Sequence, residues 1–408
     1  MNQQQTRQTP LASRHELLGA RWTNFAGWRM PLQYTGILEE HRAVRQTAGL
    51  FDLSHMGEIL FTGESALPFL AWSVTNDPAR LEPGQAQYSC LCLWDGGIVD
   101  DLVIYRLPRS ENPDSLPRWL KETAGRAAQG HHQAEFLVVV NASNREKDLS
   151  WWKRLLSEPE MAVPDKPEEL GYQPNLTDVS DGIALLAVQG PRAEAILGSV
   201  TSLETPIAEL PYYWCDWGKV GGVPALVART GYTGEDGFEL YIDARAAEAV
   251  WDALLAAGKP RGMVPVGLGA RDTLRMEMKY ALYGNDIDET TTPLEAGLGW
   301  VVKFNKGPFV GRTTLVSQKV EGVRRQLVAL VMEDRAIPRH GCPIVKNGEY
   351  VGGVTSGGFS PTLEKGIALG YVPTTLAPVG TEVQVDIRGQ LHPARVARAP
   401  LVPAHIKR

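Results

Sequence analysis

The chain has 408 residues, of which 43% are hydrophobic and 22% are charged, and its 41 Lys and Arg against 47 Asp and Glu give a net charge of −6. This length predicts two or three domains, and the composition is that of a soluble globular protein, which excludes a small disulfide-stapled module and a disordered chain. The weakly acidic balance argues against a general nucleic-acid or membrane-surface role, because both need a concentrated excess of Lys and Arg.

The first predicted helix covers residues 37–47, where Ile37, His41 and Val44 recur at helical spacing and Gly49 is a stop signal. Strands rich in Val, Ile, Leu and aromatic residues follow, at residues 57–62, 87–93, 99–105 and 136–140. Between the last two strands lies a polar segment over residues 107–135, with three prolines and the pair His131-His132. Since this segment is too long for a hairpin loop, it is either an insertion with a short helix of its own or a mobile flap.

The middle of the chain mixes helices and strands. Helices are predicted at residues 146–156, 191–197 and 246–257, the second of them opened by a proline. Strands are predicted at residues 183–188, 225–228 and 238–242, with a turn over residues 231–237 between the last two. Because strands and helices do not alternate strictly, this order predicts α+β layers and not a doubly wound parallel sheet.

From about Val323 the pattern changes to strands and turns only. Strands are predicted at residues 326–332, 350–355, 367–372 and 382–387. The pair Asn347-Gly348 has the signature of a type I′ hairpin, in which both central residues need positive φ. We therefore expect a C-terminal β-barrel or sandwich over residues 323–408, after an α+β region over residues 1–322.

The cysteines and the N-terminus bear on the cellular compartment. The cysteines at 90, 92, 215 and 342 form no CxxC pair and lack the spacing of a zinc site, which favours a reducing compartment. Cys90 and Cys92 lie two apart on a predicted strand, so we expect them to share one face and pack as small hydrophobic residues. Residues 1–10 resemble neither a signal nor a transit peptide, and no window approaches about eighteen apolar residues. We expect a cytoplasmic protein that binds no membrane and no nucleic acid.

Several common catalytic motifs do not occur in the sequence. It has no GxxxxGK[ST] phosphate loop, no strand-linked GxGxxG, no HExxH and no GxSxG nucleophile elbow. The histidines are scattered, and His55 is by default a packed or capping residue and not a metal ligand. We expect no metal centre.

A pair of acids follows a turn at residues 94–97. Asp100 and Asp101 begin a predicted strand, so their side chains point to opposite faces and one of them must face the apolar side or a cleft. A buried carboxylate gains proton affinity, which suits general acid–base work. The alternative is a strand-end aspartate satisfied by turn amides, and spacing alone favours that alternative.

A glycine-rich turn precedes another acid. Three glycines within residues 231–237 allow a tight backbone to approach a flat ligand, on which Tyr232 can stack. Glu239, on the strand that follows, can accept two hydrogen bonds from a heteroaromatic amide. The alternative is a glycine-rich hairpin with a surface acid.

A predicted helix begins near Gly269 and carries Arg271 and Asp272 in its first turn. Arg271 can serve either a ligand carboxylate or an internal ion pair, and the spacing does not choose between them. The acids over residues 286–289 miss the spacing of a calcium-binding EF-hand loop.

These segments, in this order, resemble the aminomethyltransferase family, or T proteins, of the glycine cleavage system. The resemblance runs nearly from end to end, and its motifs lie at residues 25–31, 49–56, 96–102, 140–148, 188–191, 231–239, 270–274, 282–293 and 355–362. It implies a three-domain, cloverleaf-like chain around a central channel that holds tetrahydrofolate, with a C-terminal β-barrel. The α+β region over residues 1–322 would then contain two interleaved domains.

The resemblance also implies a reaction. The family transfers an aminomethyl group from the lipoyl arm of the H protein to tetrahydrofolate, which gives 5,10-methylenetetrahydrofolate and ammonia, and it works alongside the P and L proteins. In that family the position of Asp101 is the catalytic carboxylate, the position of Glu239 recognises the pterin, and the position of Arg271 belongs to the folate site. Further residues match positions that line the pocket, and these are Met56, Tyr88, Asn141, Tyr232 and Trp300.

Two features depart from the family pattern. The segment at residues 107–135 replaces a short connection, and residues 403–408 lack the aromatic residue that some members place near folate. Two other functions share the fold: a folate-dependent demethylase, and a non-catalytic relative that maintains iron–sulfur proteins. The second carries a Lys-Gly-Cys motif, whereas this chain has Lys306-Gly307-Pro308 at the comparable place.

Overall fold

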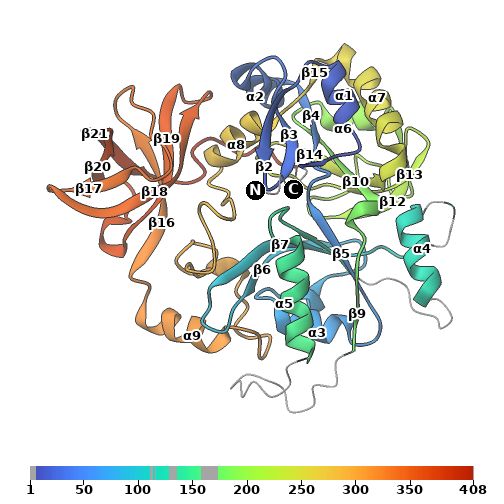
Figure 1. Ribbon diagram of the computed structural model, residues 1–408, viewed down its shortest axis with the longest axis horizontal. Helices are drawn as coiled ribbons and strands as arrows, with labels where there is room; N and C mark the ends of the chain where they lie inside the picture. Colours follow the sequence, from blue (N-terminus) through green and yellow to red (C-terminus); the bar gives the residue numbers. More distant parts are fainter. Residues whose placement is uncertain (1–5, 111–113, 115, 128–135, 158–172, 408) are drawn as a thin grey trace.

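The structure of the protein is a computed structural model that describes residues 6–110, 114, 116–127, 136–157 and 173–407. Within these residues the elements form three lobes, each built on its own sheet or barrel (Figure 1). A seven-stranded sheet lies at the upper right of the view, a five-stranded sheet below it, and a closed barrel at the left. The predicted α+β class with a C-terminal barrel is confirmed.

The seven-stranded sheet runs in the order β11-β12-β13-β14-β10-β4-β15. Its strands are β4 (Ala48–Asp52), β10 (Ile183–Gln189), β11 (Thr201–Leu203), β12 (Cys215–Val220), β13 (Val223–Ala228), β14 (Gly237–Asp243) and β15 (Met263–Pro265). Strand β10 is apolar along nearly its whole length because both of its faces are buried. Leu185 points toward the five-stranded sheet, while Leu186 points toward a second core around Trp251.

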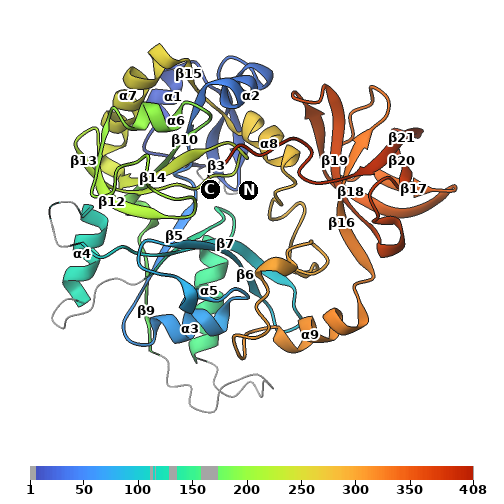
Figure 2. The same cartoon turned by 180° about the vertical axis from the view of Figure 1, so that it is seen from behind.

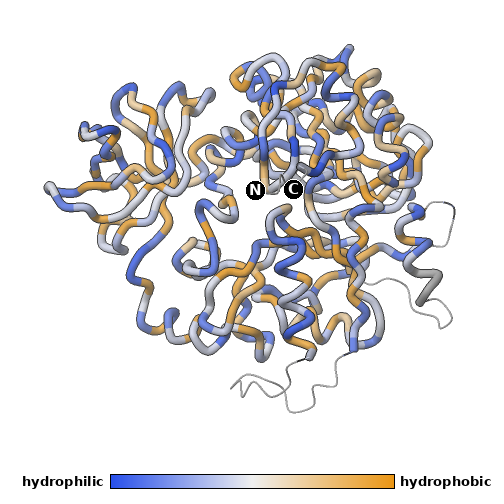
Figure 3. The backbone as a smooth tube through the Cα atoms, viewed as in Figure 1, coloured by the Kyte–Doolittle hydropathy of each residue, from blue (hydrophilic) through white to orange (hydrophobic). Residues whose placement is uncertain are grey.

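The five-stranded sheet runs in the order β6-β7-β8-β5-β9. Its strands are β5 (Gly57–Thr62), β6 (Ala86–Cys92), β7 (Ile98–Arg106), β8 (Phe136–Val140) and β9 (Asn175–Asp178). The chain enters this sheet directly from β4 and returns to the seven-stranded sheet at β10. Leu60 and Leu137 from this sheet share one buried cluster with Leu185 and Leu226 from the other, so the two sheets are joined by a common core. Figure 3 shows the apolar residues concentrated along these strands.

The barrel closes in the order β16-β19-β18-β17-β20-β21. Its strands are β16 (Arg325–Met332), β17 (Pro343–Lys346), β18 (Glu349–Ser360), β19 (Lys365–Pro373), β20 (Glu382–Ile387) and β21 (Gln390–Ala397). Asn347 and Gly348 both have positive φ and join β17 to β18, which confirms the predicted hairpin. The sequence patterns missed β17, which is short and begins with proline, and β21, which is polar and contains Pro393.

A small sheet near the N-terminus was not predicted. It consists of β1 (Arg7–Gln8), β2 (Arg21–Phe25) and β3 (Trp28–Gln33), in the order β1-β3-β2. The helices of the described residues are α1 (Ala12–Leu17), α2 (Ile37–Gln46), α3 (Ala66–Ser73), α4 (Arg118–Ala127), α5 (Arg145–Ser157), α6 (Ala193–Leu197), α7 (Ala247–Gly258), α8 (Leu268–Glu277) and α9 (Arg312–Glu321). No helix of the described residues is long and apolar enough to cross a membrane.

Most of the predicted elements are confirmed within two residues at each end. The exception is the strand predicted over residues 350–355, which continues as β18 to Ser360, and two smaller details also differ. The helix predicted from residue 191 begins at Ala193. Gly49 does not cap α2, because it lies inside β4, where a Cβ atom would collide with Val44 and Val266. Its missing side chain allows this close packing of helix against strand.

The polar segment at residues 107–135 contains α4, so the first of the two alternatives, an insertion with a short helix of its own, holds for its described residues. Trp119 and Leu120 of this helix are buried in the core between the two sheets, and Trp119 lies 6.3 Å from the ring of Trp217. The pair His131-His132 lies outside the described residues. The helix is therefore anchored to the lobe of the seven-stranded sheet.

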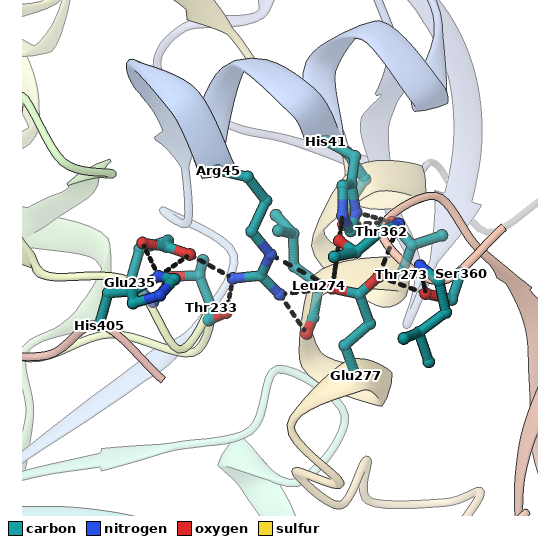
Figure 4. A network of polar contacts seen from close by, with 12 residues as sticks. His41, Arg45, Thr233, Glu235, Thr273, Leu274, Glu277, Ser360, Thr362 and His405 are labelled. Carbon is teal, nitrogen blue, oxygen red and sulfur yellow. Dashed lines mark hydrogen bonds and ion pairs between the residues drawn. The ribbon is translucent and has the colours of Figure 1, made fainter. Parts of the chain in front are cut away.

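One polar group, most of which is buried, ties the lobes together. We call it the junction cluster, and it consists of His41, Arg45, Glu235, Glu277, Ser360 and Thr362 (Figure 4). Arg45 on α2 pairs with Glu277 on α8 at 2.7 Å and with Glu235 at 2.9 Å. Glu277 also accepts hydrogen bonds from the hydroxyls of Ser360 and Thr362, which belong to the barrel lobe. The cluster therefore fixes α2, α8 and the barrel relative to one another.

The C-terminal tail crosses from the barrel to the other lobes, as Figure 2 shows. The amide of Leu401 donates to the carbonyl of Glu277, and the amide of His405 donates to the carbonyl of Gly234. The His405 ring lies 3.2 Å from the carboxylate of Glu235. The tail therefore holds the turn that carries Tyr232, and it does so with a backbone hydrogen bond. Residues 403–408 contain no Phe, Tyr or Trp that could take this role.

Candidate functional site

A cavity of about 120 Å³ lies where strands of the two sheets and helix α8 meet. Its wall includes most of the site residues predicted from the sequence: Met56, Tyr88, Asp101, Asn141, Tyr232, Glu239 and Arg271. A second cavity of about 500 Å³ shares Arg271 and Leu282 with the first. The two hollows therefore adjoin, and together they offer room for a ligand longer than either.

Asp101 faces the cavity from β7, whereas Asp100 is fully buried on the opposite side of the strand. The predicted division of the two acids between the faces is confirmed. Asp101 accepts a hydrogen bond of 2.8 Å from the hydroxyl of Tyr88 and another of 2.8 Å from the side-chain amide of Asn141. Asn141 follows directly after β8, the neighbour of β7, so the sheet itself brings the amide to the acid.

The surroundings of Asp101 change its acidity. Burial and the charge of the adjacent Asp100 raise the pKa of Asp101 to about 7, although Tyr88 and Asn141 favour the anion. A carboxyl with this pKa exchanges a proton near neutral pH, so it can act as acid or base in one reaction cycle. The alternative of a strand-end aspartate satisfied by amides describes Asp100, which accepts from Asn141 and Asn144.

Glu239 lies in the middle of the seven-stranded sheet, opposite Ala187 and Ala228. Its Oε2 accepts hydrogen bonds from the hydroxyls of Thr230 at 2.6 Å and Tyr105 at 3.1 Å. Its Oε1 has no hydrogen bond within the described residues, and burial raises the pKa of the carboxyl. The alternative of a surface acid is wrong, because the strand directs this side chain into the cavity.

The glycines of the preceding turn have a use that was not predicted. A Cβ atom at Gly231 would overlap the side chain of Gln189, and one at Gly234 would overlap Met278. These glycines therefore make room for protein side chains, and Gly231 also lies in the wall of the cavity. Gly234 also has φ of +81°, a conformation that favours glycine.

Tyr232 is held firmly within this turn. Its hydroxyl donates to the carbonyl of Ala281, and its ring stacks on Tyr280 with the centroids 5.6 Å apart. The guanidinium of Arg271 lies 4.6 Å from the centroid of the same ring. The ring is thus part of a fixed wall, and part of its surface is already covered by protein.

The guanidinium of Arg271 makes no hydrogen bond or ion pair within the described part of the chain. The neighbouring Arg275 takes the internal ion pairs instead, with Asp286 at 2.5 Å and Asp272 at 2.7 Å. Burial lowers the pKa of Arg271. Of the two roles that the spacing left open, the internal ion pair is not found, and the guanidinium lies on the wall shared by the two cavities.

Trp300 is the predicted site residue that the structure does not place in the cavity wall. Its side chain is 61% exposed, and its ring stacks on Tyr88 at 5.9 Å between centroids and an angle of 20°. Since Tyr88 donates its hydroxyl to Asp101, Trp300 touches the site through one intermediate residue.

The sequence analysis missed several residues that hold the site. Tyr105 and Thr230 contact Glu239, and Asn144 and Asp148 contact Asp100, yet none of the four was singled out as a site residue, although Thr230 adjoins the glycine-rich turn and Asp148 lies in a charged run. The two-residue period of a strand could have indicated only Tyr105, which lies on the same face of β7 as Asp101. His55 is buried against Phe25, and burial together with the charge of Arg271 lowers its pKa to about 3, which fits the packing role.

The arrangement suits proton transfer beside a bound polar ring. Asp101 can accept or release a proton, Glu239 offers an unoccupied oxygen, and Arg271 offers an unpaired cation. In the part of the chain that the structure describes, no three His, Cys, Asp or Glu side chains gather as a metal site would need.

Comparison with known families gives two matches. The family model described as GCVT N-terminal domain matches residues 11–112 and 129–306. The model described as glycine cleavage T-protein C-terminal barrel domain matches residues 325–403. The first match passes over residues 113–128, which contain α4.

Curated relatives and a solved structure agree with these matches. An aminomethyltransferase of Halothermothrix orenii is 45% identical over 97% of this chain and 100% of the relative. Another, from Symbiobacterium thermophilum, is 46% identical over 97% of this chain and 96% of the relative. The crystal structure of glycine cleavage system aminomethyltransferase T from Bartonella henselae is 34% identical and matches with a TM-score of 0.83, over 99% of this chain and 100% of that one.

Proposed function

Because the chain belongs to the glycine cleavage T-protein family of aminomethyltransferases, we propose that it transfers the aminomethyl carbon from lipoylated H protein to tetrahydrofolate. The products are 5,10-methylenetetrahydrofolate, ammonia and the reduced lipoyl arm. One observation carries the assignment of the site: Asp101, with a pKa of about 7, and Glu239, with an unoccupied oxygen, line the same cavity.

The pterin ring of the folate is proposed to lie between these two acids. Its aminopyrimidinone edge carries neighbouring N–H donors, and Oε1 of Glu239 is the acceptor left for them after Thr230 and Tyr105 have occupied Oε2. Arg271 is suited to the carboxylates at the other end of folate, because it lies on the wall shared with the second cavity. This orientation places the reactive folate nitrogens on the side of Asp101.

Asp101 is the proposed catalytic residue. Two folate nitrogens bond to the donor carbon while its C–S and C–N bonds break, so two protons leave the nitrogens and end on the thiol and on ammonia. A carboxyl with a pKa of about 7 can collect one of these protons and return it at neutral pH. Tyr88 and Asn141 hold both of its oxygens, which keeps the group in place beside the reacting atoms.

The proposed partners follow from the family. Lipoylated H protein supplies the donor, and the P and L proteins load that donor and reoxidise it. A cytoplasmic location is proposed with this function, and it agrees with the four cysteines, which are all free thiols. The names of the curated relatives favour aminomethyl transfer over the folate-dependent demethylase.

The test is turnover with lipoylated H protein, glycine-derived aminomethyl and tetrahydrofolate, with each component omitted in turn. Methylene transfer should require all three, and turnover of small methyl donors without H protein would favour the demethylase. Asp101→Asn should lower the rate by about 10²- to 10⁴-fold while folate affinity stays within a small factor. The matched control is Asp95→Asn in the exposed turn before β7, which should leave turnover unchanged. Normal turnover of Asp101→Asn would refute the catalytic role.

A further inference from the structure

Behind Asp101, two more acids are buried, and neither forms an ion pair with a cation of the described residues. Asp100 on β7 and Asp148 on α5 are both 0% exposed. The side chain of Asp148 faces Asp100 within hydrogen-bonding reach. Three carboxyls therefore lie in a row from the interior to the cavity, and only Asp101 reaches the ligand space.

The contacts of Asp100 are those of an anion. Its Oδ2 accepts from the backbone amide of Asn141 at 2.9 Å, and its Oδ1 accepts from the side-chain amides of Asn141 at 2.9 Å and Asn144 at 2.5 Å. The side-chain amide of Asn141 also donates to Asp101 at 2.8 Å. A single amide group thus bridges the acid in the interior and the acid in the cavity.

The contacts of Asp148 are those of a neutral acid. Neither of its oxygens accepts a hydrogen bond from any described residue, although both are buried. An ionised carboxylate without donors is costly in such a place, whereas a protonated carboxyl has an O–H to give. Burial and the charge of Asp100 raise the pKa of Asp148 well above its ordinary value.

We propose that Asp148 is a positioning residue that stays protonated and donates its O–H to Asp100, which keeps Asp100 an anion and so fixes how readily Asp101 takes up a proton. This inference rests on the proposed function of Asp101. Asp100 acts on Asp101 through its negative charge and through the shared amide of Asn141. Asp148 itself touches neither substrate nor the reacting atoms.

Other groups around the row do not titrate near neutral pH. Burial raises the pKa values of the hydroxyls and thiol that face it, which belong to Tyr88, Cys90, Tyr232 and Tyr283. Lys147 is the nearby cation, and it is directed away, toward the hydroxyl of Tyr283 and the carboxylate of Glu289. The pH response of the row therefore belongs to its three carboxyls.

Two substitutions separate a protonated donor from a merely structural residue. Asp148→Asn keeps a neutral N–H donor of the same shape beside Asp100, so the pH profile of kcat/KM should stay as in the wild type. Asp148→Ala removes the donor, so Asp100 takes up a proton itself. The negative charge of Asp100 then no longer raises the proton affinity of Asp101. The acidic limb of the profile should then move to lower pH by about one unit. Glu146→Gln, on the exposed side of the same helix, is the matched control and should change nothing.

A second measurement does not depend on turnover. In an Asp101→Asn background, the infrared spectrum at neutral pH should contain a protonated-carboxyl band that disappears on Asp148→Asn. Loss of this band together with an unshifted pH profile for Asp148→Asn supports the proposal. An unchanged infrared spectrum, or a profile that shifts as far with Asn as with Ala at position 148, overturns it. Because the infrared test needs neither folate nor H protein, failure of the proposed function would leave its result intact.

Discussion

The junction cluster and the cavity both contain charged side chains that are largely buried, but these charges are paired with opposite charges only in the junction cluster. In the junction cluster, Arg45 lies between Glu235 and Glu277, so each buried acid meets a cation within 2.9 Å. In the cavity, Asp101 has another acid, Asp100, as its neighbour, and Arg271 has no ion pair among the described residues.

This difference separates stability from function. Around Glu277, burial alone would raise its pKa, but contacts with His41, Ser360 and Arg45 outweigh burial and lower the pKa to about 2. Around Asp101 burial and a like charge dominate, and the pKa rises to about 7. The first region stabilises the fold by satisfying its charges, and the second keeps charges unsatisfied for a ligand and a proton.

The largest expected effect concerns the junction cluster. Glu277→Ala leaves Arg45 with Glu235 alone and takes the acceptor from the buried Ser360 hydroxyl, so it should lower the free energy of unfolding by about 3–5 kcal/mol. Chemical denaturation measures this loss. The matched control is Glu333→Ala, which removes a surface ion pair with Arg395 and should cost at most about 1 kcal/mol. Equal losses in the two variants would contradict the role of the junction cluster.

The second expected effect has the opposite sign and concerns the contribution of Asp101, in the cavity, to the stability of the protein. The folded-state pKa of Asp101 is above its ordinary value, so the native state holds the proton more tightly and stability falls as pH rises from about 4 to 7. Asp101→Asn removes this loss and should stabilise the protein by up to about 4 kcal/mol at pH values above 7. Glu277 has the reverse sign, because its contribution is present above pH 4.5 and is lost as pH falls toward 2. Unfolding curves across pH test both signs.

The same contrast explains what the sequence could predict. Local patterns placed β5, β7, β8 and β14, because their apolar runs and flanking turns are contiguous. They also placed Asp101 and Glu239, since each acid sits beside a turn in a strand. The partners that tune these acids come from other strands and from α5, so only the sheet register and the packing of that helix bring them together.

The role of the glycine-rich turn could not be predicted for the same reason. Three glycines close together indicate close approach, but the sequence does not say what approaches. The structure gives Gln189 and Met278, which come from β10 and from the end of α8. For Trp300, no local pattern indicated a site residue, and its place in the pocket was implied by the family resemblance alone. In the structure, Tyr88 lies between Trp300 and Asp101.

A smaller effect is expected for ligand binding. Glu239→Ala should weaken tetrahydrofolate binding by about 1–3 kcal/mol, because donors of the bound ring lose their acceptor. The free energy of unfolding should not fall as it does for Glu277→Ala, because burial disfavours the charged form of the Glu239 carboxyl and raises its pKa. Titration calorimetry measures the affinity, with Glu248→Ala on the exposed side of α7 as the control. Unchanged affinity would remove Glu239 from the pterin site.

The smallest effect is expected for Trp300, which lies outside the cavity wall and is largely exposed. The ring is 61% exposed and stacks on Tyr88, so its removal costs at most about 1 kcal/mol of stacking and leaves the fold intact. Because Tyr88 orients Asp101, Trp300→Ala should lower kcat a few-fold and leave the affinity for tetrahydrofolate unchanged. Tyr350→Ala, an exposed aromatic residue on the barrel, should change neither quantity. A loss of folate affinity as large as that of Glu239→Ala would instead put Trp300 in direct contact with the ligand, and the functional region would extend beyond the cavity wall.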